Sequence, residues 1–229
     1  MRWEMGRHSL FFRSRSLFFR LIIATGQGHR GTGRGWLGSV GQATSWEETV
    51  MTQPAGPDSA DWQRRWTIDA GSVTLEPVTR RIGEDVIGGG PIARRFAEGA
   101  LHDRIPQAMG FAIRDIESGA AAALPTVWLV VRRADGQIVG DLGTHGPPDT
   151  AGCVEIGYSL APSARGKGIG TAAVGALVKR LAAVPGIHRI TAVTGAGNTA
   201  SRHLLERQGF RLTGTLPGSD EVRYTLSLS

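Results

Sequence analysis

The segment 153–183 constrains the fold of this chain more than any other, because a strand pattern leads into a helix pattern through a glycine-rich turn. Its first eight residues have the β-branched and aromatic content of a strand. The turn reads Arg-Gly-Lys-Gly-Ile-Gly at residues 165–170, and Ala173, Leu177 and Leu181 then recur at helical spacing. A strand that feeds directly into a helix is typical of a sheet with helices packed against it.

The rest of the chain from residue 71 onward predicts further strands and helices. Strand patterns fall at 72–78, 126–133, 138–144, 188–193, 210–216 and 222–228. Two or three short helices, broken by a Gly-Gly-Gly-Pro sequence, are expected between residues 82 and 117. A last helix over 198–208 closes at Gly209. Hairpin strands followed by alternating strands and helices predict an α/β (α+β) fold, with a mixed sheet flanked by helices.

Positive charge is concentrated at the start of the chain. The net charge is +6, and residues 1–50 supply four of these charges through seven arginines and three glutamates. Because they show no helical or strand period, we expect a disordered basic extension there. Met51 begins a stretch typical of an ordinary N-terminus, and we hypothesise that residues 1–50 are not translated natively. Residues 51–70 are then a flexible lead-in, and residues 71–229 are the folded domain.

Several functional classes receive no support from the sequence. The one cysteine, Cys153, cannot form an internal disulfide or a zinc site, so we expect no metal and no oxidising compartment. No run approaches the ~20 apolar residues that span a bilayer, and we expect a cytoplasmic protein. Glycine patterns at 26–31 and 33–38 match dinucleotide-binding spacing. Neither precedes a convincing helix and the expected acidic residue, so we discount both.

The turn at 165–170 is the segment best suited to chemistry. Glycine lets a backbone turn tightly and approach a ligand closely, and amides at a helix start carry partial positive charge that suits a pyrophosphate. Arg165 and Lys167 add charge at the rim. No Gly-Lys-Ser/Thr sequence closes the turn, so it is not a P-loop. These six residues alone fit a phosphate site and a plain turn that begins a helix equally well.

Two motifs together resemble the GNAT superfamily of N-acetyltransferases, and within it the branch that includes ribosomal-protein N-terminal acetyltransferases. They are VEIGYSLAPSARGKGIGTAAVGALVKRL and, further on, NTASRHLLERQGF. The first contains the Arg-x-x-Gly-x-Gly pattern for the CoA pyrophosphate. The second matches an Asn-x-x-Ser…Gly-Phe signature. The resemblance is carried by motifs over 153–216, is only topological over 72–144, and does not reach residues 1–70.

The resemblance implies a mostly antiparallel sheet that splays open beside the motif, with acetyl-CoA as co-substrate. Backbone groups of the strand before the motif would pair with the pantetheine arm, and amides of the turn would hold the pyrophosphate. The positions implied for cofactor binding are Tyr158, Ser159, Leu160, Arg165, Gly166, Lys167, Gly168, Ile169, Gly170, Asn198 and Ser201.

Acyl transfer to an amine needs a neutral nucleophile, and Glu155 is our candidate base. Deprotonating a lysine-like amine of pKa ~10.4 at pH 7 costs roughly 4–5 kcal/mol. Strand alternation places Glu155, Gly157 and Ser159 on one face of the strand. Val154, Ile156 and Tyr158 lie on the other face. Small residues beside a carboxylate leave room for a ligand. A surface or substrate-positioning role is as good an interpretation of Glu155 as the role of base.

The departing thiolate needs a proton or a hydrogen bond. Many members of the family carry a tyrosine seven residues after the asparagine, but that position is Leu205 here. Ser201 is our second catalytic candidate, through a hydrogen bond to CoA or its sulfur. Tyr224 is a remote alternative. For Asn198 we favour a helix N-cap over direct cofactor contact.

We therefore predict an N-acetyltransferase that moves an acetyl group from acetyl-CoA directly to a primary amine, on a protein N-terminus or a small molecule. Selectivity is expected to come from the helices over 82–117 and the loop 146–150. A CoA-binding sensor without turnover is the alternative, favoured by the missing tyrosine. A third hypothesis is an RNA- or ribosome-associated protein acting through the basic extension, although we expect neither nucleic acid nor membrane as a partner. The oligomeric state is not readable.

Overall fold

The computed structural model describes residues 56–228, so the expectations for residues 1–50 lie outside the described residues. The strands are β1 Ile68–Ala70, β2 Val73–Pro77, β3 Val127–Arg132, β4 Ile138–Thr144, β5 Cys153–Leu160, β6 Arg189–Gly195, β7 Arg211–Thr215 and β8 Glu221–Ser227. The α-helices are α1 Ala60–Trp66, α2 Arg80–Ile87, α3 Ile105–Glu117, α4 Ile169–Ala182 and α5 Thr199–Arg207. Short 3-10 turns are η1 Ala93–Arg95, η2 Ala120–Ala122 and η3 Pro162–Ala164.

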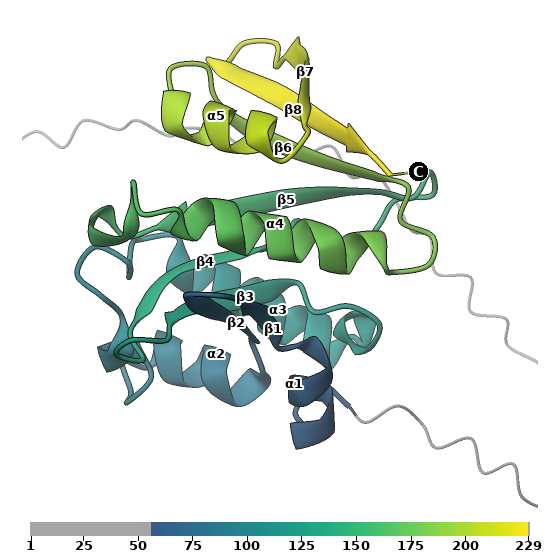
Figure 1. The fold of residues 1–229 in the computed structure, drawn as a ribbon. Helices are drawn as coiled ribbons and strands as arrows, with labels where there is room; N and C mark the ends of the chain where they lie inside the picture. The colour runs from purple at the N-terminus through teal and green to yellow at the C-terminus, as the bar shows by residue number, and fades with distance from the viewer. Residues whose placement is uncertain (1–55, 229) are drawn as a thin grey trace, which may run out of the picture. The chain divides into compact units, whose positions relative to one another are not determined.

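The strands form a single sheet in the order β1-β2-β3-β4-β5-β6-β8-β7 (Figure 1). Every neighbouring pair is antiparallel except β5 and β6, which run parallel. A parallel pair needs a crossover, and α4 supplies it between these two strands. The predicted mixed, mostly antiparallel sheet flanked by helices is confirmed.

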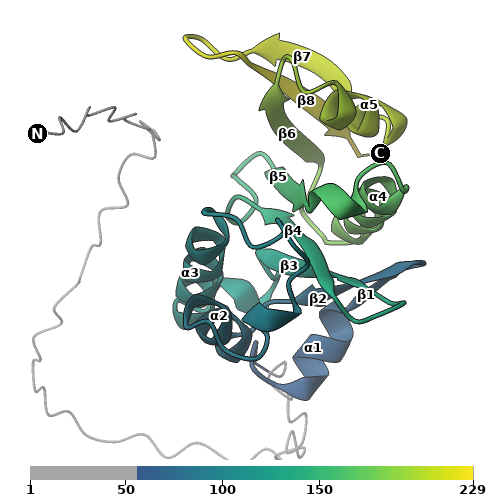
Figure 2. The same ribbon diagram turned by 90° about the vertical axis from the view of Figure 1, so that its left-hand side faces the viewer.

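Helices cover the sheet from both sides. Figure 2 shows α2 and α3 against one face, with α1 and α4 against the opposite face. Two buried apolar clusters correspond to these layers. The larger lies under α1, α4 and α5, and the smaller lies between β3 and the α2–α3 pair. The sheet therefore has one face toward α4 and the other toward α3.

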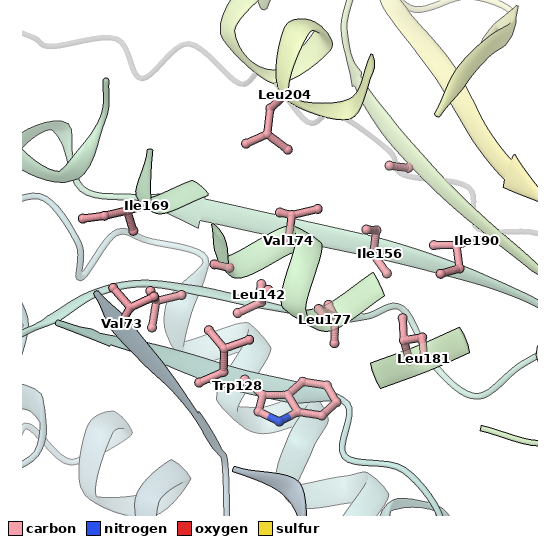
Figure 3. Close-up of a cluster of buried hydrophobic side chains, with 14 of the residues drawn as sticks. Val73, Trp128, Leu142, Ile156, Ile169, Val174, Leu177, Leu181, Ile190 and Leu204 are labelled. Carbon is pink, nitrogen blue, oxygen red and sulfur yellow. The ribbon is translucent and has the colours of Figure 1, made fainter. Parts of the chain in front are cut away.

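The larger cluster confirms the helix spacing read from the sequence. Leu177 and Leu181 of α4 are fully buried, and Ala173 is 2% exposed. They lie near Leu142 and Ile156 of the neighbouring strands (Figure 3). Trp128 and Phe210 also belong to this core, because both are at most 2% exposed. Packing of α4 on the sheet fixes the position of its N-terminal turn.

The helix α1 differs from the flexible lead-in expected over residues 51–70. Ser59 caps it by accepting a hydrogen bond from the Trp62 amide, and Trp62 and Trp66 are almost fully buried. The Trp128 indole donates to the Trp66 carbonyl over 2.9 Å, and the Arg180 guanidinium lies over the Trp66 ring. A seven-residue helix is too short to show a period, so the sequence pattern missed it.

Element boundaries are close to those predicted. β4 and β5 have the expected bounds, and α4 ends one residue earlier than expected. Gly209 follows Gln208, the C-cap of α5, and has a φ of +85°, as a glycine that closes a helix requires. Within residues 56–228, no helix combines the length and apolar character needed to cross a bilayer.

Candidate functional site

The strands β5 and β6 pair over only half of their length. Their register runs from Cys153 opposite Arg189 to Ile156 opposite Ala192, and then stops. β5 continues to Leu160 and β6 to Gly195, so each strand presents an unpaired edge toward the other. Figure 1 shows the two strands close at one end and apart at the other. The splay implied by the family resemblance is confirmed.

Tyr158, Ser159 and Leu160 lie in this unpaired half of β5. They keep their pairing with β4 on the other side, where Leu142 is opposite Tyr158 and Asp141 is opposite Ser159. Backbone amides and carbonyls that point toward β6 have no strand partner there. Such an edge is a template for an added extended segment, with the Leu160 carbonyl already held by the Arg165 side chain.

The turn from β5 to α4 is built from glycines in left-handed conformations. Gly166 has a φ of +70° and Gly168, the N-cap of α4, a φ of +77°. No side chain caps α4, so its first amides are free. A Cβ added at either glycine would meet nothing within 4 Å, which leaves the approach to these amides open. The free helix start is suited to an anionic group.

The other turn residues have distinct structural roles. The Arg165 Nε donates to the Leu160 carbonyl over 3.0 Å, so this side chain, expected to add charge at the rim, is held at the end of β5. Lys167 is exposed. A Cβ on Gly170 would come within 2.8 Å of Leu204, so this glycine lets α4 pack closely on α5. The Ile169 side chain is buried, so only the backbone amide of this residue is available to a ligand.

The start of α5 reaches β5 through side-chain hydrogen bonds. Asn198 Oδ1 accepts from the Ser201 amide over 3.2 Å, which confirms the predicted N-cap. The Ser201 Oγ lies 2.8 Å from the Tyr158 hydroxyl. Burial raises the pKa of Tyr158, and the bond to Ser201 opposes that rise. The structure thus brings together two residues, from β5 and α5, that the sequence pattern selected separately.

Glu155 faces the α3 side of the sheet, as alternation predicted, because Val154 and Ile156 are buried in the cluster on the other face. Its Oε1 lies 3.0 Å from Nδ1 of His145, which directly follows β4. The bond to Glu155 raises the pKa of His145, against burial. The same bond lowers the pKa of Glu155, also against burial, and the charge of Arg223 on β8 adds to that lowering.

A second polar cluster lies further along the same face. The Arg104 amide donates to His102 Nδ1, so Nε2 carries the hydrogen and donates to Ser159 Oγ over 2.8 Å. Ser159 in turn donates to Asp141. Burial raises the pKa of Asp141, and the bond from Ser159 opposes this. This chain of bonds ties the segment before α3 to the sheet.

Sequence reasoning missed His102, Asp141 and His145. Asp141, Gly143 and His145 alternate along the strand predicted at 138–144 and just beyond it, and this alternation was the available signal. The register that brings them opposite Ser159, Gly157 and Glu155 cannot be read from either strand alone.

The two other positions considered for a proton donor, Tyr224 and Leu205, both belong to the buried core. Tyr224 is fully buried, its hydroxyl donates to Glu206, and it accepts from Arg202. Leu205, at the position where the family resemblance led us to look for a tyrosine, is also fully buried. Over residues 56–228, no three His, Cys, Asp or Glu side chains group in a way that could hold a metal ion.

Residues 90–211 match a family model described as an acetyltransferase (GNAT) domain. This match covers more than half of the chain and includes the splay, the turn and the start of α5. The chain belongs to the GNAT acetyltransferase family. The match starts upstream of the motifs, in the helical region where the sequence showed only a topological likeness.

Similar proteins support this GNAT assignment. The uncharacterized N-acetyltransferase YjdG of Bacillus subtilis (strain 168) is 35% identical over 85 residues, which is 37% of this chain and 51% of YjdG. The chain spans about half the length of the curated relatives it matches.

Solved structures share the fold. The ribosomal-protein-S5-alanine acetyltransferase from Vibrio fischeri superposes with a TM-score of 0.52 at 15% identity, over 71% of this chain and 97% of that protein. The microcin self-immunity acetyltransferase MccE, in complex with acetyl-CoA and AMP, gives a TM-score of 0.50 at 18% identity, over 68% and 92%.

Proposed function

We propose that this GNAT protein is an N-acetyltransferase that moves an acetyl group from acetyl-CoA to a primary amine. The observation that carries the proposal is the open edge of β5 leading into the uncapped start of α4. An extended thioester carrier with a pyrophosphate suits both features, since it can pair with a strand edge and place its negative charge at a helix start.

The binding assignment follows from these two features. Backbone groups of Tyr158 and Leu160 pair with the pantetheine arm, since those of Ser159 point toward β4, and amides within the turn 165–170 hold the pyrophosphate. Lys167 adds a positive charge beside them. Asn198 contributes by capping α5, which holds Ser201 in place. This arrangement directs the thioester toward the point where β5 and β6 separate.

The transfer itself is assigned to groups on either side of the splay. The pair formed by Glu155 and His145 takes the proton that the amine loses as its nitrogen attacks the thioester carbonyl. A C–N bond forms, the C–S bond breaks, and the sulfur receives a proton through the hydroxyls of Ser201 and Tyr158. Two hydroxyls in contact can pass a proton that a lone serine is too weak an acid to supply.

The acceptor class is a protein N-terminus or a small-molecule amine. The shared fold with an enzyme named for the S5 alanine supports a protein N-terminus. We assign selectivity for the acceptor to the segment before α3 and to the loop 146–150 beside His145. The His102 side chain holds the first of these segments on the sheet. A cytoplasmic location, which the sequence led us to expect, remains a prediction.

A CoA-binding sensor without turnover is the second candidate, because Leu205 replaces the tyrosine that many relatives use as an acid. The experiment that separates the two is an acceptor panel with acetyl-CoA, read by CoA release, in parallel with binding calorimetry. Transfer to at least one amine supports the enzyme. Binding of acetyl-CoA with no transfer to peptides, polyamines, aminoglycosides or amino acids supports the sensor.

A further inference from the structure

His145 and Glu155 form an imidazole–carboxylate pair whose position is fixed by the sheet. Beyond the Nδ1–Oε1 contact of 3.0 Å, the His145 amide donates to the Glu155 carbonyl over 2.8 Å. The ladder between β4 and β5 therefore continues one step past β4 and holds the two side chains on one face. The Glu155 side chain is 33% exposed and that of His145 is 65% exposed, so the carboxylate lies deeper and the ring lies outside it.

The second ring nitrogen lies where the strands begin to part. A Cβ built on Gly157 would be 2.8 Å from His145 Nε2 and 3.2 Å from Cε1, so the ring packs directly over this glycine. Gly157 is the first residue of β5 beyond its last pair with β6. Nε2 has no hydrogen-bond partner within residues 56–228, whereas Nδ1 is occupied by Glu155.

We propose that His145 is the base that takes the proton from the acceptor amine through Nε2, and that Glu155 is a positioning residue that holds the Nδ1–H. This inference rests on the proposed acetyltransferase function. The amine nitrogen gives its proton to Nε2 as the C–N bond forms, and the C–S bond breaks to leave a sulfur that is protonated from the Ser201 side. The imidazolium then releases its proton to solvent, since the ring is exposed.

The charges around the pair favour this division of roles. Glu155 stabilises the imidazolium and raises the pKa of His145 above its ordinary value of ~6.5. The pKa of Glu155 is held below its ordinary value by His145 and Arg223, which makes this carboxylate a weak base for an amine. Further along the same face, Asp141 and His102 are engaged with Ser159.

The test is the pH dependence of kcat, at saturating acetyl-CoA and acceptor, for His145→Gln and Glu155→Gln, with calorimetric affinity for acetyl-CoA measured alongside. We expect His145→Gln to lower kcat by about 10²-fold or more and to remove the rise of kcat with pH. Glu155→Gln should lower kcat by about tenfold and keep the rise, displaced to lower pH because the charge that raised the His145 pKa is gone. Both should bind acetyl-CoA within about threefold of the original chain.

Three further variants test whether the effect is merely structural. His188→Gln changes an exposed histidine directly before β6 and should leave the profile unchanged. Gly157→Ala keeps both titratable groups but pushes the ring aside, so kcat should fall at least tenfold. Gly214→Ala, at a glycine of β7 where a Cβ would meet nothing within 4 Å, is its matched control and should have no effect on kcat.

The outcomes separate this proposal from the proposed function. A kcat for His145→Gln within about threefold of the original chain, or a larger loss in Glu155→Gln than in His145→Gln, would overturn the role of His145 while transfer itself stands. Absence of transfer by the original chain to every acceptor would overturn both.

Discussion

The hydroxyl oxygens of Tyr158 and Ser201 lie 2.8 Å apart, and this contact joins β5 to α5 across the splay. In the transfer that we propose, it places a phenol beside the serine assigned to the departing thiolate. A relay of this kind offers a route for the proton that does not depend on a tyrosine at position 205. Because the two groups act in series, their contributions to turnover should be coupled.

We therefore expect Ser201→Ala and Tyr158→Phe each to lower kcat by about tenfold to a hundredfold, with little change in acetyl-CoA affinity. The double variant should be no slower than the slower single variant, since removing either group breaks the same path. Steady-state kinetics on the four proteins measures this coupling. Losses that multiply in the double variant would mean that the hydroxyls act independently.

The left-handed glycine at the start of α4 offers a second prediction with a closely matched control. Gly168 and Gly218 have φ values of +77° and +76°, and a Cβ at either would meet nothing within 4 Å. Alanine at each position should therefore lower the free energy of unfolding similarly, by about 1–2 kcal/mol. Only Gly168→Ala should also weaken CoA binding, by about tenfold, because its methyl group lies beside the free amides.

Thermal unfolding and calorimetry on both glycine variants check this prediction. Gly218 lies in the turn between β7 and β8, remote from α4 in the sequence and outside the proposed binding residues. Equal CoA affinities for the two variants would argue against phosphate binding at the turn.

Asn198 should act on stability rather than on chemistry. Its side chain caps α5, so Asn198→Ala should cost about 1 kcal/mol and lower the Tm by about 2–4 °C. Asn198→Ser can accept the same amide hydrogen bond and should recover most of that loss. Differential scanning calorimetry measures both, and a serine variant that is stable but fails to bind acetyl-CoA would instead indicate direct contact with the cofactor.

The sequence predicted the elements of the site better than the contacts between them. The bounds of β4 and β5, the glycine turn and the Asn198 cap depend on local patterns, which a single segment carries. The bond between Glu155 and His145 depends on the register between two strands, and no local pattern encodes that register. Ser159 was selected for its backbone, whereas its hydroxyl joins His102 to Asp141.

Residues near the start of the folded part were the least predictable. The helix α1 spans seven residues within a Gly-, Pro- and Ser-containing stretch, and local propensity there is weak. Its stability comes from Trp62 and Trp66, four residues apart, which are buried against the sheet. This burial depends on tertiary packing, which a local sequence pattern does not encode.

The packing of α1 leads to a prediction about where the folded part begins. A chain that starts at residue 71 lacks both tryptophans and should be less stable by several kcal/mol than a chain that starts at residue 56. Trp66→Ala in the longer chain should cost about 3–5 kcal/mol. Denaturant unfolding measures each value, and equal stability of the two chain lengths would show that α1 contributes nothing to the fold.

The most direct test of the central claim is a calorimetric titration of the full chain with acetyl-CoA. If the open edge of β5 and the free amides of α4 form the binding site, the titration should show one site per chain with a dissociation constant in the micromolar range. Glutamate in place of Lys167 should weaken this binding by placing negative charge beside the pyrophosphate. No heat of binding with either acetyl-CoA or CoA, or unchanged affinity after that charge reversal, would contradict the account.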